Sequence, residues 1–150
     1  MGLPPFRQLA PEDAGAGSQN YALAQDARGV LYLGNLSGVF SFDGEWWQRL
    51  EYPSPAMVGA LAADATGRVA VGGVDEIGFF EPGFAHRSRY RSLTAELPAG
   101  TPALGFVVSA QALPQRGFAF LTESAFWIWN SNALVRVAEL SPEPAPRCFR

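Results

Sequence analysis

Residues 22–34 read ALAQDARGVLYLG, and residues 60–72 read ALAADATGRVAVG. The two stretches lie 38 residues apart and share seven identical residues in thirteen positions, with both glycines of each stretch in register. Internal similarity at a fixed period of this length is typical of repeat proteins. The chain is therefore expected to consist of units of about 38 residues.

Each unit carries the signals of short strands joined by tight turns. Asp26-Ala27-Arg28-Gly29 predicts a hairpin turn, because the Asp carboxylate accepts hydrogen bonds from nearby backbone N–H groups and Gly tolerates a positive φ. Asn35–Gly38 and Asp43-Gly44 predict two further turns. The apolar stretches between the turns show no 3.6-residue period. One unit is thus expected to be four short antiparallel strands.

A third, weaker copy is expected at residues 117–129, GFAFLTESAFWIW, which align with Gly67–Phe79 at an offset of 50. Four-stranded units of this length predict an all-β fold, a partial β-propeller of about three four-stranded antiparallel blades. A single domain is expected over residues 1–150, with blades at about 19–50, 57–93 and 105–140 and a tail at 141–150.

Three blades are too few for a closed ring, because propellers have about four to eight. The outer faces of the first and last blades are therefore expected to be apolar and exposed. Two explanations are open: the chain is a truncated part of a longer protein, or copies of it assemble.

The first unit, SQNYALAQDARGVLYLGNLSGVFSFDGEWWQRL (residues 18–50), resembles the first blade of the two-component regulator propeller family. The residues that match are Asp26, Gly29, Leu31, Tyr32, Gly34, Gly38 and Val39, and in the second unit Asp64, Gly67, Val69, Val71 and Gly72. The second unit departs from the pattern at residues 75–80, which are similar to a variant run in one branch of the family. The resemblance covers about residues 15–130.

The resemblance implies a ligand-recognising sensor domain fragment of a bacterial signal-transduction receptor. Members of the family are extracytoplasmic, which implies a periplasmic location, although the chain opens with no signal-peptide pattern. The implied partners are further blades, signalling domains such as a kinase, a cyclase or a DNA-binding regulator, and an unknown small molecule, for some members a carbohydrate. The full receptor could act as a homodimer.

The residues give little sign of catalysis, so the chain is not expected to be an enzyme. The sequence has one histidine, His86, one cysteine, Cys148, no lysine and no Gly-x-Ser-x-Gly motif, so triads, phosphate loops and metal clusters are not expected. No cofactor is expected. A net charge of -3 argues against nucleic-acid binding, and no apolar run is long enough to span a membrane.

Three residues are candidates for ligand binding. Asp75 and Glu76 interrupt an apolar stretch and could make polar contacts near a propeller face, or simply form a solvated hairpin tip. Trp46 could stack on a sugar or pack between blades, since it and Trp47 point to opposite faces of a strand. Two other functions stay open: a protein-interaction scaffold, or the non-catalytic blades of a carbohydrate-active propeller enzyme.

Overall fold

The computed structural model describes residues 2, 5–54, 56–83, 87–115 and 117–140, and it is all-β. Blade 1 contains β1 (Asn20–Gln25), β2 (Leu31–Asn35), β3 (Gly38–Phe42) and β4 (Trp47–Arg49). Blade 2 contains β5 (Ala60–Ala63), β6 (Val69–Gly72), β7 (Ile77–Glu81) and β8 (Arg89–Ser92). Blade 3 contains β9 (Val107–Leu113), β10 (Gly117–Thr122), β11 (Ala125–Trp129) and β12 (Leu134–Glu139).

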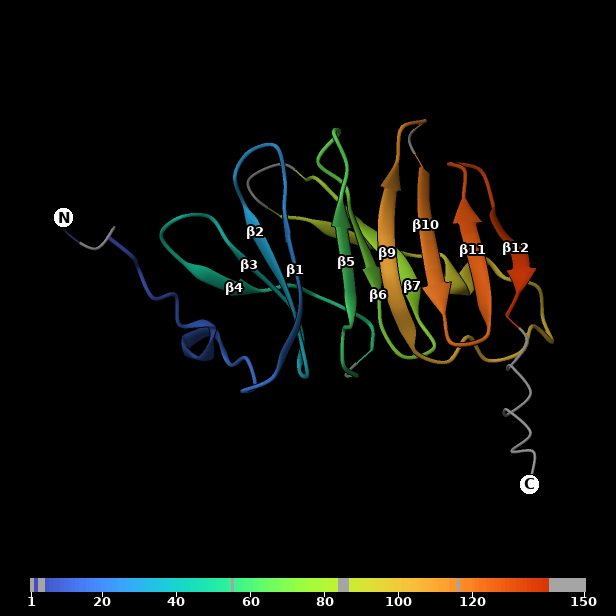
Figure 1. Cartoon of the computed structure of the whole chain (residues 1–150), viewed down its shortest axis with the longest axis horizontal. Helices are drawn as coiled ribbons and strands as arrows, with labels where there is room; N and C mark the ends of the chain where they lie inside the picture. The colour runs from blue at the N-terminus through green and yellow to red at the C-terminus, as the bar shows by residue number, and fades with distance from the viewer. Residues whose placement is uncertain (1, 3–4, 55, 84–86, 116, 141–150) are drawn as a thin grey trace, which may run out of the picture.

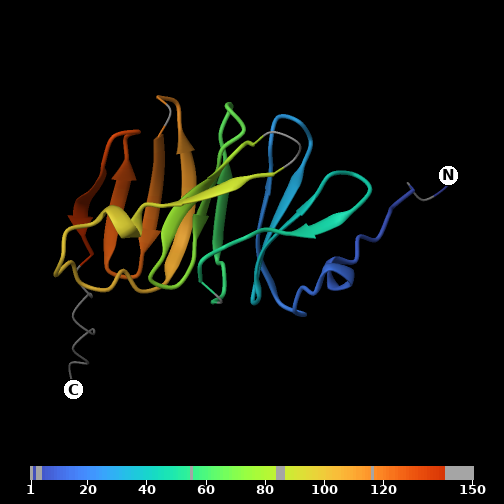
Figure 2. The ribbon, with the colours of Figure 1, turned by 180° about the vertical axis from the view of Figure 1, so that it is seen from behind.

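The three sheets are antiparallel and follow one another in chain order, as Figure 1 shows. In each blade, strands that are hydrogen-bonded to each other also follow one another in the sequence. The first strands of the blades pack beside one another, β1 against β5 and β5 against β9. Figure 2 shows the same succession of sheets from behind. This arrangement fits a partial β-propeller, as the repeat predicted.

The Asp-x-x-Gly turns form as the sequence predicted. The Asp26 carboxylate accepts hydrogen bonds from the backbone N–H groups of Arg28 and Val30, at 2.9 and 3.1 Å. Gly29 has a φ of 86°, a conformation that costs glycine little and other residues more. Asp64 and Gly67 repeat this arrangement in blade 2. The two aspartates are thus buried turn caps.

The hydrophobic core lies between the blades. Between blades 1 and 2 the buried residues are Tyr32, Val39, Leu50, Val58, Leu61, Val69, Val71 and Phe80. Between blades 2 and 3 the core is more aromatic and includes Phe79, Phe118, Phe120, Trp127 and Trp129. Each blade therefore depends on its neighbours for most of its apolar burial.

An arginine crosses the second joint between blades. The Arg68 guanidinium lies 5.1 Å from the ring centroid of Trp129 and 5.4 Å from that of Phe118. Its position is fixed by Asp64, whose carboxylate oxygen lies 2.7 Å away. A cation held over aromatic faces stabilises such a contact, so this Asp–Arg pair links a blade 2 turn to blade 3.

The expected register of the third copy is wrong by one residue. Val69 faces blade 1, and Phe118 takes the equivalent place facing blade 2, whereas an offset of 50 aligns Val69 with Ala119. Strand pairing agrees, because Gly72 pairs with Ile77 in blade 2 as Leu121 pairs with Phe126 in blade 3. A one-residue slip moves every side chain to the other face of a sheet. The corrected register shows which residues of blade 3 face outward.

The outer face of blade 1 is less exposed than expected. The segment before β1 folds back over it, beginning with the 3₁₀ helix η1 (Pro11–Ala14), and Ala14 and Ala16 pack on Leu33, Phe40 and Trp47. The Arg7 guanidinium lies 5.5 Å from the Phe42 ring centroid. Residues 5–17 therefore cover part of the face that a preceding blade would occupy. The outer face of blade 3, in contrast, carries Val135, which pairs with Ile128 and is 48% exposed.

Candidate functional site

A shallow polar groove opens at the joint between blades 1 and 2. One part is a pocket of about 60 Å³ lined by Arg28, Val30, Tyr32, Ser41, Asp43, Trp46, Gln48, Gly83 and Ser88. A neighbouring hollow of about 410 Å³ shares Gln48 and Ser88 with it and adds Arg49, Leu50, Glu51 and Arg87. The pocket alone is far smaller than the 300–1,000 Å³ typical of small-molecule sites. A ligand would therefore lie along the groove.

Ser41 and Gln48 supply polar groups to this groove. They form a cross-strand pair on β3 and β4, on the blade 1 face that turns toward blade 2. Across the part of the chain that the structure describes, neither side chain has a hydrogen-bond partner. Both can therefore bond to a ligand without breaking a contact of the folded protein.

A cluster of one exposed arginine and two buried side chains, Asp26 and Tyr32, closes the other side of the pocket. The Arg28 guanidinium contacts an Asp26 carboxylate oxygen at 2.6 Å and donates to the Tyr32 hydroxyl at 3.2 Å. Burial and the Asp26 carboxylate both raise the pKa of Tyr32. The hydroxyl is therefore a neutral polar group at neutral pH, and the charge of Arg28 is largely matched by Asp26.

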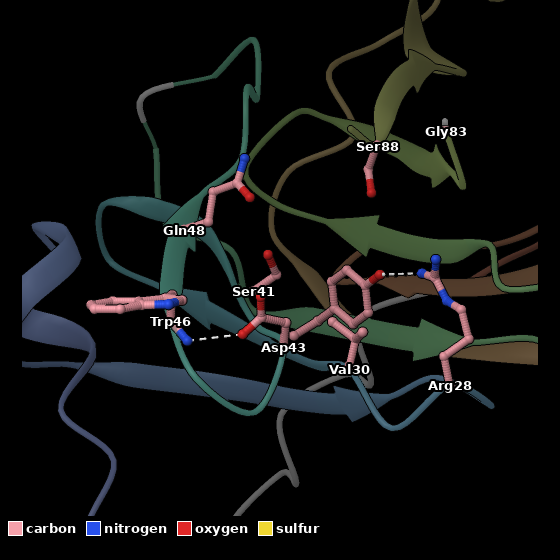
Figure 3. A pocket seen from close by; sticks show the side chains of 9 residues that line it. Arg28, Val30, Ser41, Asp43, Trp46, Gln48, Gly83 and Ser88 are labelled. Carbon is pink, nitrogen blue, oxygen red and sulfur yellow. Dashed lines mark hydrogen bonds between the residues drawn. The ribbon is translucent and has the colours of Figure 1, made fainter. Parts of the chain in front are cut away.

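Trp46 forms the rim of the pocket and is 74% exposed. The Asp43 turn sets its position, because the Asp43 carboxylate accepts a hydrogen bond from the Trp46 backbone N–H at 2.8 Å. Figure 3 shows its indole directed away from Arg28, while Ser41 and Gln48 lie closer to the pocket. Trp47 points the other way and packs on Phe42, with ring centroids 5.1 Å apart. Because Trp46, Ser41 and Gln48 line the same pocket, one ligand could contact the indole and the polar groups together.

Asp75 lies elsewhere, in the turn between β6 and β7. Its φ of 55° is left-handed, and its carboxylate accepts a hydrogen bond from the Gly105 N–H at 2.7 Å. The Asp75 N–H in turn donates to the Gly105 carbonyl at 2.9 Å. Asp75 therefore ties blade 2 to the segment that enters blade 3, and it borders a separate hollow with Thr94, Leu97, Pro98, Thr101, Pro102, Ala103 and Leu104.

Glu76 is engaged within blade 2. Its carboxylate accepts a hydrogen bond from the Tyr90 hydroxyl at 2.8 Å. Burial raises the pKa of Tyr90, and the Glu76 charge raises it further. Tyr90 also packs edge-on against Tyr52, with ring centroids 5.1 Å apart. The Glu76–Tyr90 hydrogen bond therefore links the start of β7 to β8.

The three residues chosen from the sequence are therefore not brought together. Trp46 borders the groove in blade 1. Asp75 and Glu76 lie in blade 2, outside the pocket that Trp46 lines, and make hydrogen bonds within the fold. Sequence reasoning missed Ser41 and Gln48. The repeat offered a signal for Ser41. This serine occupies the repeat position of Phe79, and Phe79 is buried in blade 2.

The described residues contain no group of three or more His, Cys, Asp or Glu side chains that could hold a metal ion. None of their helices is long and apolar enough to cross a membrane. His86 and Cys148 lie outside the described residues.

Fold and site together define the chain as an all-β repeat protein with propeller-like blades and a polar groove between two of them. Searches against protein-family models and against the curated proteins found no match for this chain.

Proposed function

We propose that this chain is a ligand-recognising segment of a sensor domain in a bacterial signalling receptor, and that its ligand is an oligosaccharide. The groove between blades 1 and 2 carries this proposal. It combines an exposed indole with the side chains of Ser41 and Gln48, which have no hydrogen-bond partner within the described part of the chain. The resemblance of residues 18–50 to a sensor propeller family supports the signalling role and a periplasmic location.

The chemistry of the groove favours a sugar chain over a compact ligand. An indole offers a flat apolar surface on which the C–H face of a sugar ring can stack. Amide and hydroxyl side chains donate and accept hydrogen bonds, as sugar hydroxyls require. The groove is shallow, so a ligand would contact it along several units and stay partly in solvent.

Binding in this groove could be coupled to signalling through the joint that it spans. Blade 1 contributes Ser41 and Gln48, while Gly83 and Ser88 belong to blade 2. A ligand that touches both blades favours one arrangement of the joint over others, and it shifts the conformational equilibrium by its difference in affinity. We therefore assign ligand recognition to this segment and the signalling output to other parts of the receptor.

The proposal is tested by titration calorimetry of the 150-residue chain with a panel of hexasaccharides of glucose, xylose and galacturonic acid. We expect one member to bind, and Trp46→Ala and Gln48→Ala each to weaken binding by about tenfold, equal to about 1.4 kcal/mol. Tyr21→Ala, which removes an exposed aromatic ring from β1, is the matched control and should bind normally. Binding that is insensitive to Trp46 and Gln48, or no binding across the panel, would contradict the proposal.

A further inference from the structure

The hollow beside Asp75 lies at the opposite end of the sheets from the polar groove. The groove involves the β1–β2 and β3–β4 turns of blade 1, whereas the hollow is formed by the β6–β7 turn and the connection from β8 to β9. Successive turns of an antiparallel sheet lie at alternate ends of its strands. Figures 1 and 2 show the connection to β9 along the lower ends of the sheets and the β1–β2 turn at the upper ends. The hollow is therefore a separate site.

The size of this hollow suits a small molecule. Its volume is about 400 Å³, within the 300–1,000 Å³ that is typical of small-molecule sites. Its lining comes from the turn of blade 2 and from the segment that enters blade 3. A molecule in the hollow would therefore contact both sides of the second joint between blades.

Hydrogen bonds within the protein hold the walls of the hollow in place. On one side, the 3₁₀ helix η3 (Thr94–Glu96) is fixed to β7, because the Thr94 hydroxyl oxygen accepts a hydrogen bond from the Ile77 N–H at 2.8 Å. Further along, the Thr101 hydroxyl donates to the Pro98 carbonyl at 2.7 Å. The paired hydrogen bonds between Asp75 and Gly105 fix the opposite wall. The hollow is thus formed by the fold itself, so binding requires little ordering of the chain.

Most of the lining is apolar. The apolar members are Leu97, Pro98, Pro102, Ala103 and Leu104. Leu104 is buried in the core between blades 2 and 3, and Leu97 packs against that core. The hollow therefore has an apolar floor that can bury the hydrocarbon part of a ligand.

The polar side chains of the lining offer acceptors and a negative charge. One Asp75 carboxylate oxygen accepts the Gly105 N–H, and the other has no hydrogen-bond partner within the part of the chain that the structure describes. The Thr101 hydroxyl uses its only proton on Pro98, so its oxygen can still accept a hydrogen bond. None of the described residues that line the hollow is basic. A ligand that complements these groups must donate hydrogen bonds and carry positive charge.

We propose that this hollow binds an organic amine, a primary ammonium group on a small apolar body. An ammonium group has three donors and no acceptor, which matches Asp75 and Thr101. The apolar body would pack on Leu97 and the neighbouring prolines. A neutral molecule would lose the charge interaction with Asp75, and an anion would be repelled by it. This site is independent of the proposed oligosaccharide groove and gives the segment a second class of ligand.

The test is a chemical-shift titration of the ¹⁵N-labelled 150-residue chain with 2-phenylethylamine hydrochloride. Two probes with the same ring are compared with it: 2-phenylethanol, which is neutral, and phenylacetate, which is an anion. We expect the amine to shift the backbone amides of Thr94, Thr101 and Gly105, with much smaller changes from the alcohol and none from the anion.

Asp75→Asn should weaken amine binding by about fivefold, as expected when a partly exposed ion pair is lost. Asparagine can still accept the Gly105 N–H, and it tolerates the left-handed backbone at this position. The matched control is Asp13→Asn, which removes an exposed carboxylate in η1, away from the hollow, and should bind the amine normally.

A second variant tests the site without changing charge. Ala103→Trp places a large side chain at an exposed position of the lining, and it should abolish amine binding while the circular dichroism spectrum stays that of the parent chain. Equal binding of the three probes, full affinity in Asp75→Asn or Ala103→Trp, or no amine-induced shifts at the hollow would overturn the proposal. Loss of oligosaccharide binding in the groove variants, with amine binding intact, would leave this inference standing.

Discussion

At the scale of single residues, the two turn aspartates do more than close hairpins. Burial raises the pKa of Asp64, but hydrogen bonds from Thr66 and Arg68 outweigh burial and hold the pKa below its ordinary value. Asp26 behaves in the same way, with Arg28 as its main partner. Because the pKa values are lowered by folding, both carboxylates stabilise the protein above the pKa of the unfolded chain, and this stabilisation is lost as the pH falls through the folded pKa.

We therefore expect the unfolding free energy to fall with acidification below about pH 4, near the ordinary pKa of Asp. Asp64→Asn should lower stability by about 1–3 kcal/mol at pH 7, because Arg68 keeps its partly buried position but loses the Asp64 carboxylate. The deficit should shrink below about pH 4. Urea denaturation at a series of pH values measures both effects. A pH-independent deficit for Asp64→Asn would refute this account.

At the scale of strands and sheets, the same side chain has a different role on a covered and an uncovered face. Ala70 of β6 is fully buried against blade 3. Ala119 of β10 has the equivalent position on the outer face of blade 3. The two alanines are therefore a matched pair for measuring how tightly the blades pack.

Ala70→Leu should destabilise the chain by about 1–3 kcal/mol, because extra methylene groups in a packed core force neighbouring side chains to move. Ala119 is 7% exposed but has no further sheet over it in the described chain, so Ala119→Leu should cost less than Ala70→Leu. Thermal or urea unfolding of both variants tests this. Equal costs would mean that the joint between blades 2 and 3 is loosely packed or that the outer face of blade 3 is already covered.

Much of this level of structure could be predicted from the sequence. The Asp-x-x-Gly turns fixed the first two blades because the turn chemistry is local to a few residues. Blade 3 was harder to predict, because Leu113 stands at the position of the turn aspartate. Its strands also have irregular pairing between Leu121 and Thr122 and between Phe126 and Trp127. Each irregularity changes how residues are counted along a strand without leaving a clear mark in the sequence.

The candidate site was less predictable than the fold. The cover of residues 5–17 on blade 1 and the groove at Ser41 and Gln48 both depend on contacts between segments far apart in the sequence. The residues that stood out, Asp75 and Glu76, did so because charges interrupt an apolar stretch, and the structure gives each a hydrogen-bond partner inside the fold. Ser41 did not stand out, because a serine in a strand attracts no attention until its repeat partner Phe79 is seen to be buried.

At the scale of the whole molecule, the cores lie between sheets, so the array is a chain of mutually dependent blades. The N-terminal segment covers one end of the array, while the other end presents an apolar face. Between these ends, the groove at the first joint brings Ser41 and Gln48, which have no hydrogen-bond partner among the described residues, together with the exposed Trp46 indole. A recognition role for this groove is the central claim.

Chemical-shift mapping of the ¹⁵N-labelled chain, titrated with the hexasaccharide that binds in calorimetry, tests this claim most directly. We expect the largest changes at the Trp46 indole N–H, the Gln48 side-chain amide and the backbone amides of Ser41 and Ser88. Residues around the separate hollow at Asp75, such as Thr94 and Thr101, should not shift. Changes centred on Asp75, or spread without focus over the molecule, would contradict the assignment of ligand recognition to the joint between blades 1 and 2.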